Sequence, residues 1–465
     1  MTTKKEKRLN LIKMLGFSLL LILVLSLVYK VLSWKDTSGG YQSVTSQLYN
    51  TDKNLIDAVA LGSSHTYAGI YPLFIWEDYG ISFFDMSVSG QDKNSTYYDL
   101  KELLKTQSPK VVFVDLYGAM FDKHAVQGNV YRNMLALKTS KNSIDLVNAY
   151  IEKGQRSDYI LRWPIIHTRY KELERYDFED YEYSLYGRGE FFGFATEVCT
   201  YPVGALNEEV TPINDLNKEW IDKLTDLSLS EGFDLYFTVI PFSITEEERA
   251  KMNGVIEYAE SLGYKTFDFI DMAYDLNISW EEDFSDGLHL NNKGAEKISR
   301  YLGEWLSENY DLTDHRGDSD YYQWDEDLYY YKALLRERAL PSLNLDQILN
   351  HVYSSKDLVA LVSLDNDFGD RGQYLETFGI TEDEYLNGGK WVISSKEIVC
   401  LSDNTQTFRR YYSINSHENV KCAPEAEIIN YRLNLNDEPI VHVENGMSVT
   451  IYDSTLDKVI LRAGY

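Results

Sequence analysis

The first 310 residues alternate short apolar runs with longer amphipathic segments. The apolar runs predict strands, at 56–61, 81–86, 111–116, 235–240 and 264–269. The amphipathic segments repeat apolar side chains at helical spacing and predict helices, at 71–79, 95–106, 217–230, 246–262 and 291–309. The run at 111–116 is apolar at nearly every position, which is typical of a parallel strand covered on both faces. This alternation predicts βαβ units, and therefore an α/β fold with a parallel sheet between two layers of helices.

The amino terminus predicts a single membrane-spanning helix. Basic residues fill much of positions 4–13, and the chain then runs from Met14 to Trp34 with Lys30 as its one charge. About 20 apolar residues suffice to cross a bilayer as a helix. The basic flank stays in the cytoplasm, so the rest of the chain is expected outside. We therefore expect residues 1–34 to be a cytoplasmic flank and a single-pass anchor in the cell membrane; a cleaved signal peptide is the alternative.

The pattern also suggests how the rest of the chain divides. Residues 35–54 are polar and are predicted as a stalk. The α/β domain would span 55–310, with an insertion at about 120–210 that is rich in Tyr, Glu, Asp and Arg and could cap a site. A charged linker at 311–334 then leads to 335–465, which is predicted as a separate α+β or mostly-β domain. Its predicted strands are at 358–364, 391–394, 397–401, 408–414, 428–433 and 448–452.

Charge and cysteine content narrow the possible functions. The net charge is −28, which argues against a nucleic-acid partner because such binding needs clustered Lys and Arg. Cys400 and Cys422 could form a disulfide and leave Cys199 free, a question that the sequence leaves open. No Cys or His cluster has metal-ligand spacing, so we expect neither a metal nor another cofactor.

Three short segments carry the candidate chemistry, each at a strand end or at a helix start. Ser64 follows the first predicted strand in Gly-Ser-Ser-His, where it can be a nucleophile or an ordinary helix cap. Asp286 lies three residues before His289, just ahead of the last helix, and can orient that imidazole as a base; the alternative is a cap beside a surface histidine. Gly90 follows the second strand, where its N–H can face an oxyanion or merely form a turn.

The order and spacing of these segments resemble the SGNH (GDSL-like) hydrolase superfamily. Ser64 matches the serine of the Gly-Asp-Ser block, with Ser63 in place of its Asp. Gly90 matches the second-block glycine, and Asp286 with His289 match the Asp-x-x-His of the last block. The Gly-Ser-Ser form and the amino-terminal anchor are similar to the cell-envelope acyl-transfer branch, which includes the D-alanyl-lipoteichoic acid and alginate O-acetylation proteins. This resemblance implies a flavodoxin-like, three-layer SGNH fold with Ser64, His289 and Asp286 as its triad.

The third block departs from the family pattern. The superfamily usually supplies an oxyanion-binding Asn there, whereas this chain has Asp115-Leu116-Tyr117. Tyr117 or Gln91 could replace the missing donor, or the hole could consist of two backbone N–H groups. His65, next to the nucleophile, could line the pocket, or it could have a structural or surface role.

The resemblance implies a membrane-anchored, extracytoplasmic serine esterase or O-acyltransferase that acts on acyl esters of a cell-surface polysaccharide. A transfer role would imply a multispanning membrane acyltransferase as donor partner. The alternative is a non-catalytic binding or scaffold subunit of a polysaccharide modification or export complex. A shorter resemblance, at 446–454 and 358–364 with the Gly379 turn, is similar to the interleukin-like EMT-inducer/PANDER-type domain. It implies a lectin-like or protein-binding accessory module.

Overall fold

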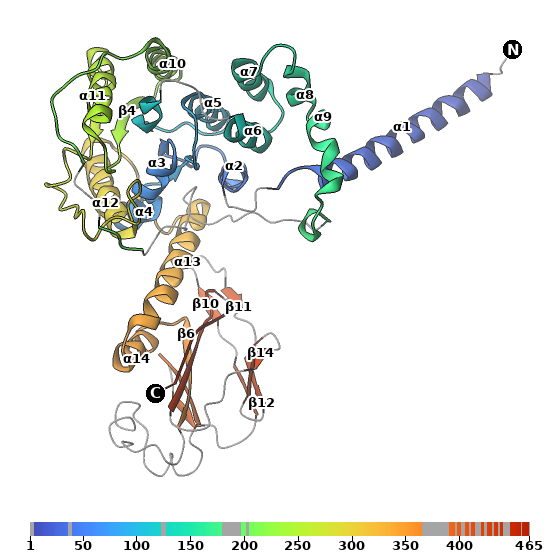
Figure 1. The fold of residues 1–465 in the computed structure, drawn as a ribbon. Helices are drawn as coiled ribbons and strands as arrows, with labels where there is room; N and C mark the ends of the chain where they lie inside the picture. The colour runs from blue at the N-terminus through green and yellow to red at the C-terminus, as the bar shows by residue number, and fades with distance from the viewer. Residues whose placement is uncertain are drawn as a thin grey trace. The chain divides into compact units, whose positions relative to one another are not determined.

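A computed structural model gives the architecture of the chain (Figure 1). It describes residues 4–35, 40–121, 127–178, 197–200 and 204–364, then 390–395, 447–456, 458–464 and the short strands named below. The chain divides into two compact units, Met1–Asp314 and His315–Tyr465. Each unit is described by itself.

The first unit is built on a five-stranded parallel sheet. Its strands are β1 (Ala58–Leu61), β2 (Phe83–Asp85), β3 (Val111–Asp115), β4 (Asp234–Val239) and β5 (Thr266–Asp268). Their order is β2-β1-β3-β4-β5, and every neighbouring pair is parallel. The five predicted strands are therefore confirmed, each within a few residues of its predicted ends. Since all the strands run in one direction, their carboxyl ends lie along one edge, where open sheets of this kind bind ligands.

Helices cover both faces of this sheet. The helices that follow the strands are α3 (Ser64–Gly69), α4 (Pro72–Tyr79), α5 (Lys93–Leu103), α10 (Asp215–Glu231), α11 (Glu246–Ser261) and α12 (Asn292–Asn309). Alternate strand residues such as Ala60 and Phe113 pack with Ile75 of α4 and Leu302 of α12 in one apolar core. The intervening strand residues are also buried, and on their side α10 contacts β4 and α5, while α11 contacts β5 and α10. The predicted α/β fold with a parallel sheet is confirmed.

The amino-terminal helix α1 (Lys4–Leu32) carries the predicted apolar span. Within its segment Arg8–Leu32, an 18-residue window has a mean hydropathy of 2.6 and no buried residue, so by length and composition the helix could be a membrane anchor or a signal sequence. It is the one such helix among the described residues. Residues 35–54, predicted as a stalk, contain helix α2 (Tyr41–Asn50), whose apolar residues Tyr41, Val44 and Leu48 are buried. This segment is therefore packed onto the domain.

The described part of the insertion forms a small helical subdomain. Its elements are α6 (Gln127–Ala136), α7 (Lys141–Tyr150), α8 (Arg156–Leu161), α9 (Trp163–Ile166), η2 (His167–Lys171) and η3 (Arg175–Phe178). Residues Met134 to Ile151 contribute a separate apolar core. Residues 197–200 run beside the loop ahead of α12, where Cys199 N–H donates to the Phe284 carbonyl at 2.8 Å.

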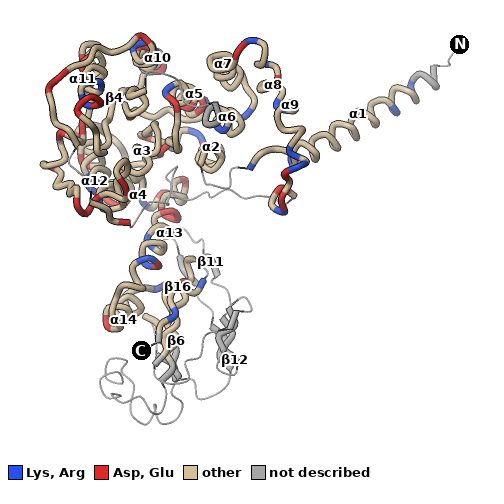
Figure 2. Tube along the Cα trace, viewed as in Figure 1, with Lys and Arg blue, Asp and Glu red and all other residues tan. Residues whose placement is uncertain are grey.

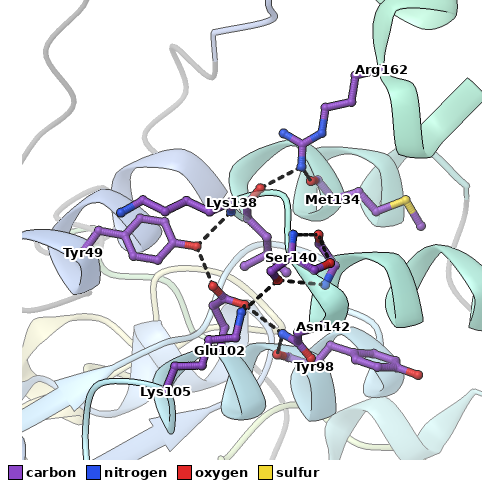
Figure 3. A network of polar contacts seen from close by, with 11 residues as sticks. Tyr49, Tyr98, Glu102, Lys105, Met134, Lys138, Ser140, Asn142 and Arg162 are labelled. Carbon is purple, nitrogen blue, oxygen red and sulfur yellow. Dashed lines mark hydrogen bonds and ion pairs between the residues drawn. The ribbon is translucent and has the colours of Figure 1, made fainter.

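A polar network attaches these helices to the sheet domain (Figure 3). Glu102 of α5 is buried and accepts from the Tyr49 hydroxyl at 3.0 Å and from the Asn142 side chain at 2.8 Å. Tyr49 in turn accepts the Lys138 backbone N–H at 3.0 Å. Arg162 donates to the carbonyl of Met134, near the end of α6, at 3.0 Å. Both carboxylate oxygens of Glu102 have partners, so its burial avoids the cost of an unpaired charged group.

The second unit is α+β, as predicted. Its helices are α13 (Tyr322–Ala339) and α14 (Leu345–Ser354), each flanked by a short turn, η4 (Ser319–Tyr321) and η5 (Leu340–Ser342). An antiparallel sheet in the order β16-β15-β6-β7-β8 packs on α14. Its strands are β6 (Leu358–Leu364), β7 (Lys390–Ser394), β8 (Ile398–Cys400), β15 (Met447–Asp453) and β16 (Lys458–Gly464).

A further sheet, in the order β14-β13-β12-β9, and a β10-β11 hairpin complete the second unit. These strands are β9 (Thr405–Phe408), β10 (Tyr411–Ser413), β11 (Val420–Cys422), β12 (Ala426–Ile429), β13 (Arg432–Leu435) and β14 (Glu438–Pro439). Gly379 and the side chains of Cys400 and Cys422 lie outside the described residues, so their predicted turn and disulfide stay predictions. Helix α13 begins within the predicted linker. The sequence did not predict this helix, because its charged and Tyr-rich residues obscure the helical repeat.

Candidate active site

Ser64 is held at the carboxyl edge of the sheet by a tight turn after β1. A Cβ at Gly62 would lie 2.1 Å from the Thr66 hydroxyl oxygen and 2.8 Å from Asp115 Cβ, so only glycine fits there. Ser63 caps the helix in extended conformation, and Ser64 is the first residue of α3. Ser63 is buried, whereas Ser64 is partly exposed. The turn therefore presents the second serine, and not the first, at the edge of the sheet.

The loop before α12 holds Asp286 and His289 together. Asp286 Oδ1 accepts the backbone N–H groups of Leu288 at 2.8 Å and His289 at 2.9 Å. His289 Nδ1 lies 2.8 Å from Asp286 Oδ2. Partial burial would raise the pKa of Asp286, but these hydrogen bonds and the nearby His289 outweigh burial and lower that pKa below its usual value. An ionised Asp286 accepts a hydrogen bond from Nδ1–H, which leaves Nε2 of the neutral imidazole as an acceptor.

The two segments meet although 225 positions separate them. Ser64 Oγ lies 2.8 Å from His289 Nε2, and the His289 side chain is only 13% exposed. A serine hydroxyl is a weak nucleophile until an adjacent base, oriented by a third group, takes its proton. The structure therefore brings together the three residues that the sequence predicted as a triad.

The loop after β2 lies against the Ser64 turn. Val88 N–H donates to the Gly62 carbonyl at 3.3 Å, and Gly90 follows in an exposed turn with a φ of 65°. Gln91 is buried, and its side-chain amide donates to Asp99 Oδ2 at 2.5 Å. That bond occupies the Gln91 amide in the fold, so Gln91 is a poorer replacement for the missing third-block Asn than its position suggested.

His65 and Tyr117 form an aromatic wall beside His289. Their rings stack with centroids 3.5 Å apart, and the His65 centroid is 5.3 Å from that of His289. Burial lowers the pKa of His65 well below its usual value, so its ring is neutral around pH 7. Ring contacts with Phe242 extend the wall. His65 is therefore a buried packing residue beside His289, and the predicted alternative of a surface role does not apply.

Tyr67 is a site residue that the sequence reasoning missed. It lies one turn after Ser64 on α3 and is buried, and its hydroxyl hydrogen-bonds with the side chains of Ser64 and Ser89. Burial raises its pKa to about 12, so it remains a neutral donor. The i, i+3 spacing from Ser64 was the signal available, because such residues share one helix face.

Two carboxyl groups lie beneath this edge. Asp85 ends β2 and accepts the Ser87 N–H at 2.9 Å, and Asp115 ends β3 and accepts the Tyr117 N–H at 3.2 Å. Complete burial raises the pKa of each to about 7. Within the described part of the chain, no group of three or more His, Cys, Asp or Glu side chains could hold a metal ion.

Comparison with known families and proteins gives no assignment. No protein-family model matches the chain, and no curated protein shows a significant match. The fold itself defines an α/β protein whose strand order is flavodoxin-like and consistent with an SGNH-type domain. Any finer assignment rests on the site.

Proposed function

We propose that this chain is a membrane-anchored serine esterase or O-acyltransferase of SGNH type. One observation carries the proposal: the continuous hydrogen-bonded series from Ser64 Oγ through the His289 ring to Asp286. The same residues in the same order carry the resemblance in the sequence. The acceptor nitrogen of His289 faces the hydroxyl that it would deprotonate, as nucleophilic catalysis requires.

The proposed reaction has two halves. Ser64 Oγ attacks the ester carbonyl carbon while His289 Nε2 takes the hydroxyl proton. The ester C–O bond then breaks, and His289 gives that proton to the departing alcohol, leaving an acyl group on Ser64. Water, or a sugar hydroxyl, next attacks the acyl carbon and loses its proton to His289. The bond from the acyl carbon to Ser64 Oγ then breaks, and His289 returns the proton to Ser64 Oγ as the acid or the new ester leaves. Asp286 stays ionised and stabilises the transient imidazolium.

The developing oxyanion needs donors beside Ser64. The N–H groups of Ser64 and Gly90 are proposed as two of them. The Tyr67 hydroxyl is proposed as the third, because the third block carries Asp115 in place of Asn and Asp115 accepts rather than donates. One such donor is worth roughly 100- to 1000-fold in turnover.

The proposed substrate is an acyl ester of a cell-surface polysaccharide, because α1 as an anchor would hold the site outside the membrane. A multispanning membrane acyltransferase would supply the acyl group in a transfer reaction. The C-terminal unit is proposed as an accessory module that binds polysaccharide or protein. A second candidate, a non-catalytic scaffold subunit, is favoured by one observation, the acceptor side chain of Asp115 where the family has a donor.

Covalent labelling tests the proposal. The full chain in detergent is treated with a fluorophosphonate probe, which phosphonylates activated serines. We expect the wild type and Ser63→Ala to be labelled and Ser64→Ala to be inert. Ser63 is the matched control because it is the adjacent hydroxyl and is buried. A folded wild type that stays unlabelled would favour the scaffold. For a reactive chain, release of acyl groups from an acetylated polysaccharide, with and without an added polyol, separates hydrolysis from transfer.

A further inference from the structure

Residues 156–178 expose large apolar side chains in a short stretch of the insertion. Leu161 is 63% exposed, Tyr170 63% and Phe178 68%. Over the same range the chain has five Arg or Lys and four Asp or Glu, a net charge of +1, whereas the whole chain has −28. Single exposed apolar side chains are normal on a protein surface, so the location of these three beside the apolar span carries the argument.

This segment holds the outer end of α1. Arg169 Nη1 donates to the carbonyls of Leu32 at 3.0 Å and Ser33 at 2.6 Å, which satisfies acceptors that the last helical turn leaves unpaired. The same guanidinium pairs with buried Asp177 at 2.9 Å. Lys35 Nζ donates to the Asp177 carbonyl at 2.7 Å. The segment is therefore continuous with the end of the apolar span, and Figure 2 shows charged residues of both signs at this junction.

The length of the span places that junction at the membrane surface. Its 25 residues make a helix of about 37 Å, against about 30 Å for the hydrocarbon core. The ring of Trp163 contacts that of Tyr29 with centroids 5.6 Å apart, and Tyr29 lies about 4.5 Å below Leu32 along the helix. Trp and Tyr are enriched at this depth. Residues packed against this turn are therefore level with the lipid headgroups.

We propose that residues 156–178 form a membrane collar, which lies in the outer headgroup region of the bilayer with Leu161, Tyr170 and Phe178 in contact with lipid. The collar rests on α1 being kept as an anchor. The collar contacts lipid and not another protein, because the segment continues directly from the apolar span. Exposed Lys171 and Arg175 lie on or beside the same short helices, and their long side chains can reach lipid phosphates while their stems cover apolar surface. The collar would fix the height of the site above the membrane.

Quenching by brominated lipid tests the collar in the full chain. Tyr170→Trp and Phe178→Trp each add one reporter, in nanodiscs of phosphatidylcholine and phosphatidylglycerol with or without bromine on the acyl chains. The matched controls are Tyr274→Trp and Leu229→Trp, at positions that are 89% and 77% exposed on other elements. After subtraction of the parent fluorescence, we expect bromine to quench each collar reporter at least about twofold and to leave the controls unchanged, since interfacial side chains sit about 5–10 Å deep.

Equal quenching at collar and control positions would overturn the inference. Loss of α1 from the mature chain, read by intact mass, would overturn it too. Circular dichroism of each variant checks the fold, and the two collar positions report independently. The readout is lipid contact and not turnover, so failure of the collar and failure of the serine chemistry are distinguished by fluorophosphonate labelling of the same samples.

Discussion

Two buried carboxyl clusters, one in each unit, are compensated in different ways. In the parallel-sheet unit, Asp99 is fully buried and accepts from the neutral amides of Gln91 and Asn133, each at 2.5 Å. In the C-terminal unit, buried Asp453 accepts from the Arg336 guanidinium at 3.0 Å, and Asp357 lies 3.6 Å from the same group. The Arg336 guanidinium compensates the charge of Asp453 and Asp357, whereas neutral donors compensate that of Asp99 incompletely.

This difference separates polar groups that stabilise a fold from polar groups that surround a reactive edge. Near the site, burial raises the pKa of Asp85 and Asp115 to about 7 and that of Asp99 to about 8. A protonated carboxyl group adds no negative charge beside a nucleophile. The comparison predicts that changes in the C-terminal unit alter stability, and that changes around the site alter turnover or pH dependence.

Removal of the buried cation should have the largest effect. Arg336→Met leaves Asp453 and Asp357 buried without their guanidinium partner, which typically costs about 3–5 kcal/mol. We expect faster hydrogen exchange in β6 and β15, measured by mass spectrometry, with β1 and β3 unchanged. Lys458→Met is the matched control, because its ion pair with Glu337 is exposed and is worth about 1 kcal/mol or less. Equal exchange in both variants would contradict the comparison.

Loss of the Tyr67 hydroxyl should reduce turnover instead. Tyr67→Phe keeps the buried ring but removes the proposed oxyanion donor, so we expect kcat to fall about 100- to 1000-fold, or about 3–4 kcal/mol, with KM nearly unchanged. Steady-state ester hydrolysis measures both constants. Ser89→Ala leaves the Tyr67 hydroxyl in place and should lower kcat less than Tyr67→Phe does. A Tyr67→Phe variant with the wild-type kcat would show that two backbone donors suffice.

The smallest effect is expected in the pH dependence of stability. The folded-state pKa of Asp99, about 8, lies above its unfolded value, so the folded state keeps the proton longer and stability falls as pH rises from about 4 to 8. Burial is the main cause, and Glu102 raises this pKa further. Asp99→Asn removes one titrating group. It should reduce the slope of the unfolding free energy against pH by up to about 1.4 kcal/mol per pH unit.

The titration of His65 limits the pH range in which the unfolding free energies are compared. Burial lowers the pKa of His65, so this residue destabilises the fold below about pH 6.5, in the opposite sense. Denaturant unfolding of wild type and Asp99→Asn is therefore compared between pH 6.5 and 8. An unchanged slope in the variant would mean that Asp99 is ionised in the folded protein.

Much of the first unit was readable from local pattern. The apolar run at 111–116 forms β3. The three triad residues were predicted from the order of their motifs, because a strand end, a turn glycine and an Asp-x-x-His are each local signals. Helix α13 was missed since its buried residues, among them Trp324 and Tyr331, alternate with half-buried tyrosines and with charged residues. Tyr67 was missed because neither its burial nor its contact with Ser89 is visible in the sequence.

By itself, the sequence determined the apolar span, the succession of strands and helices and the residue types able to carry acyl chemistry, since these depend on neighbours in the chain. Tertiary structure alone decided that Ser64 and His289 lie 2.8 Å apart, that Gln91 is bound to Asp99, and that residues 156–178 hold the end of α1. Such contacts join distant segments, and packing of the whole domain sets them.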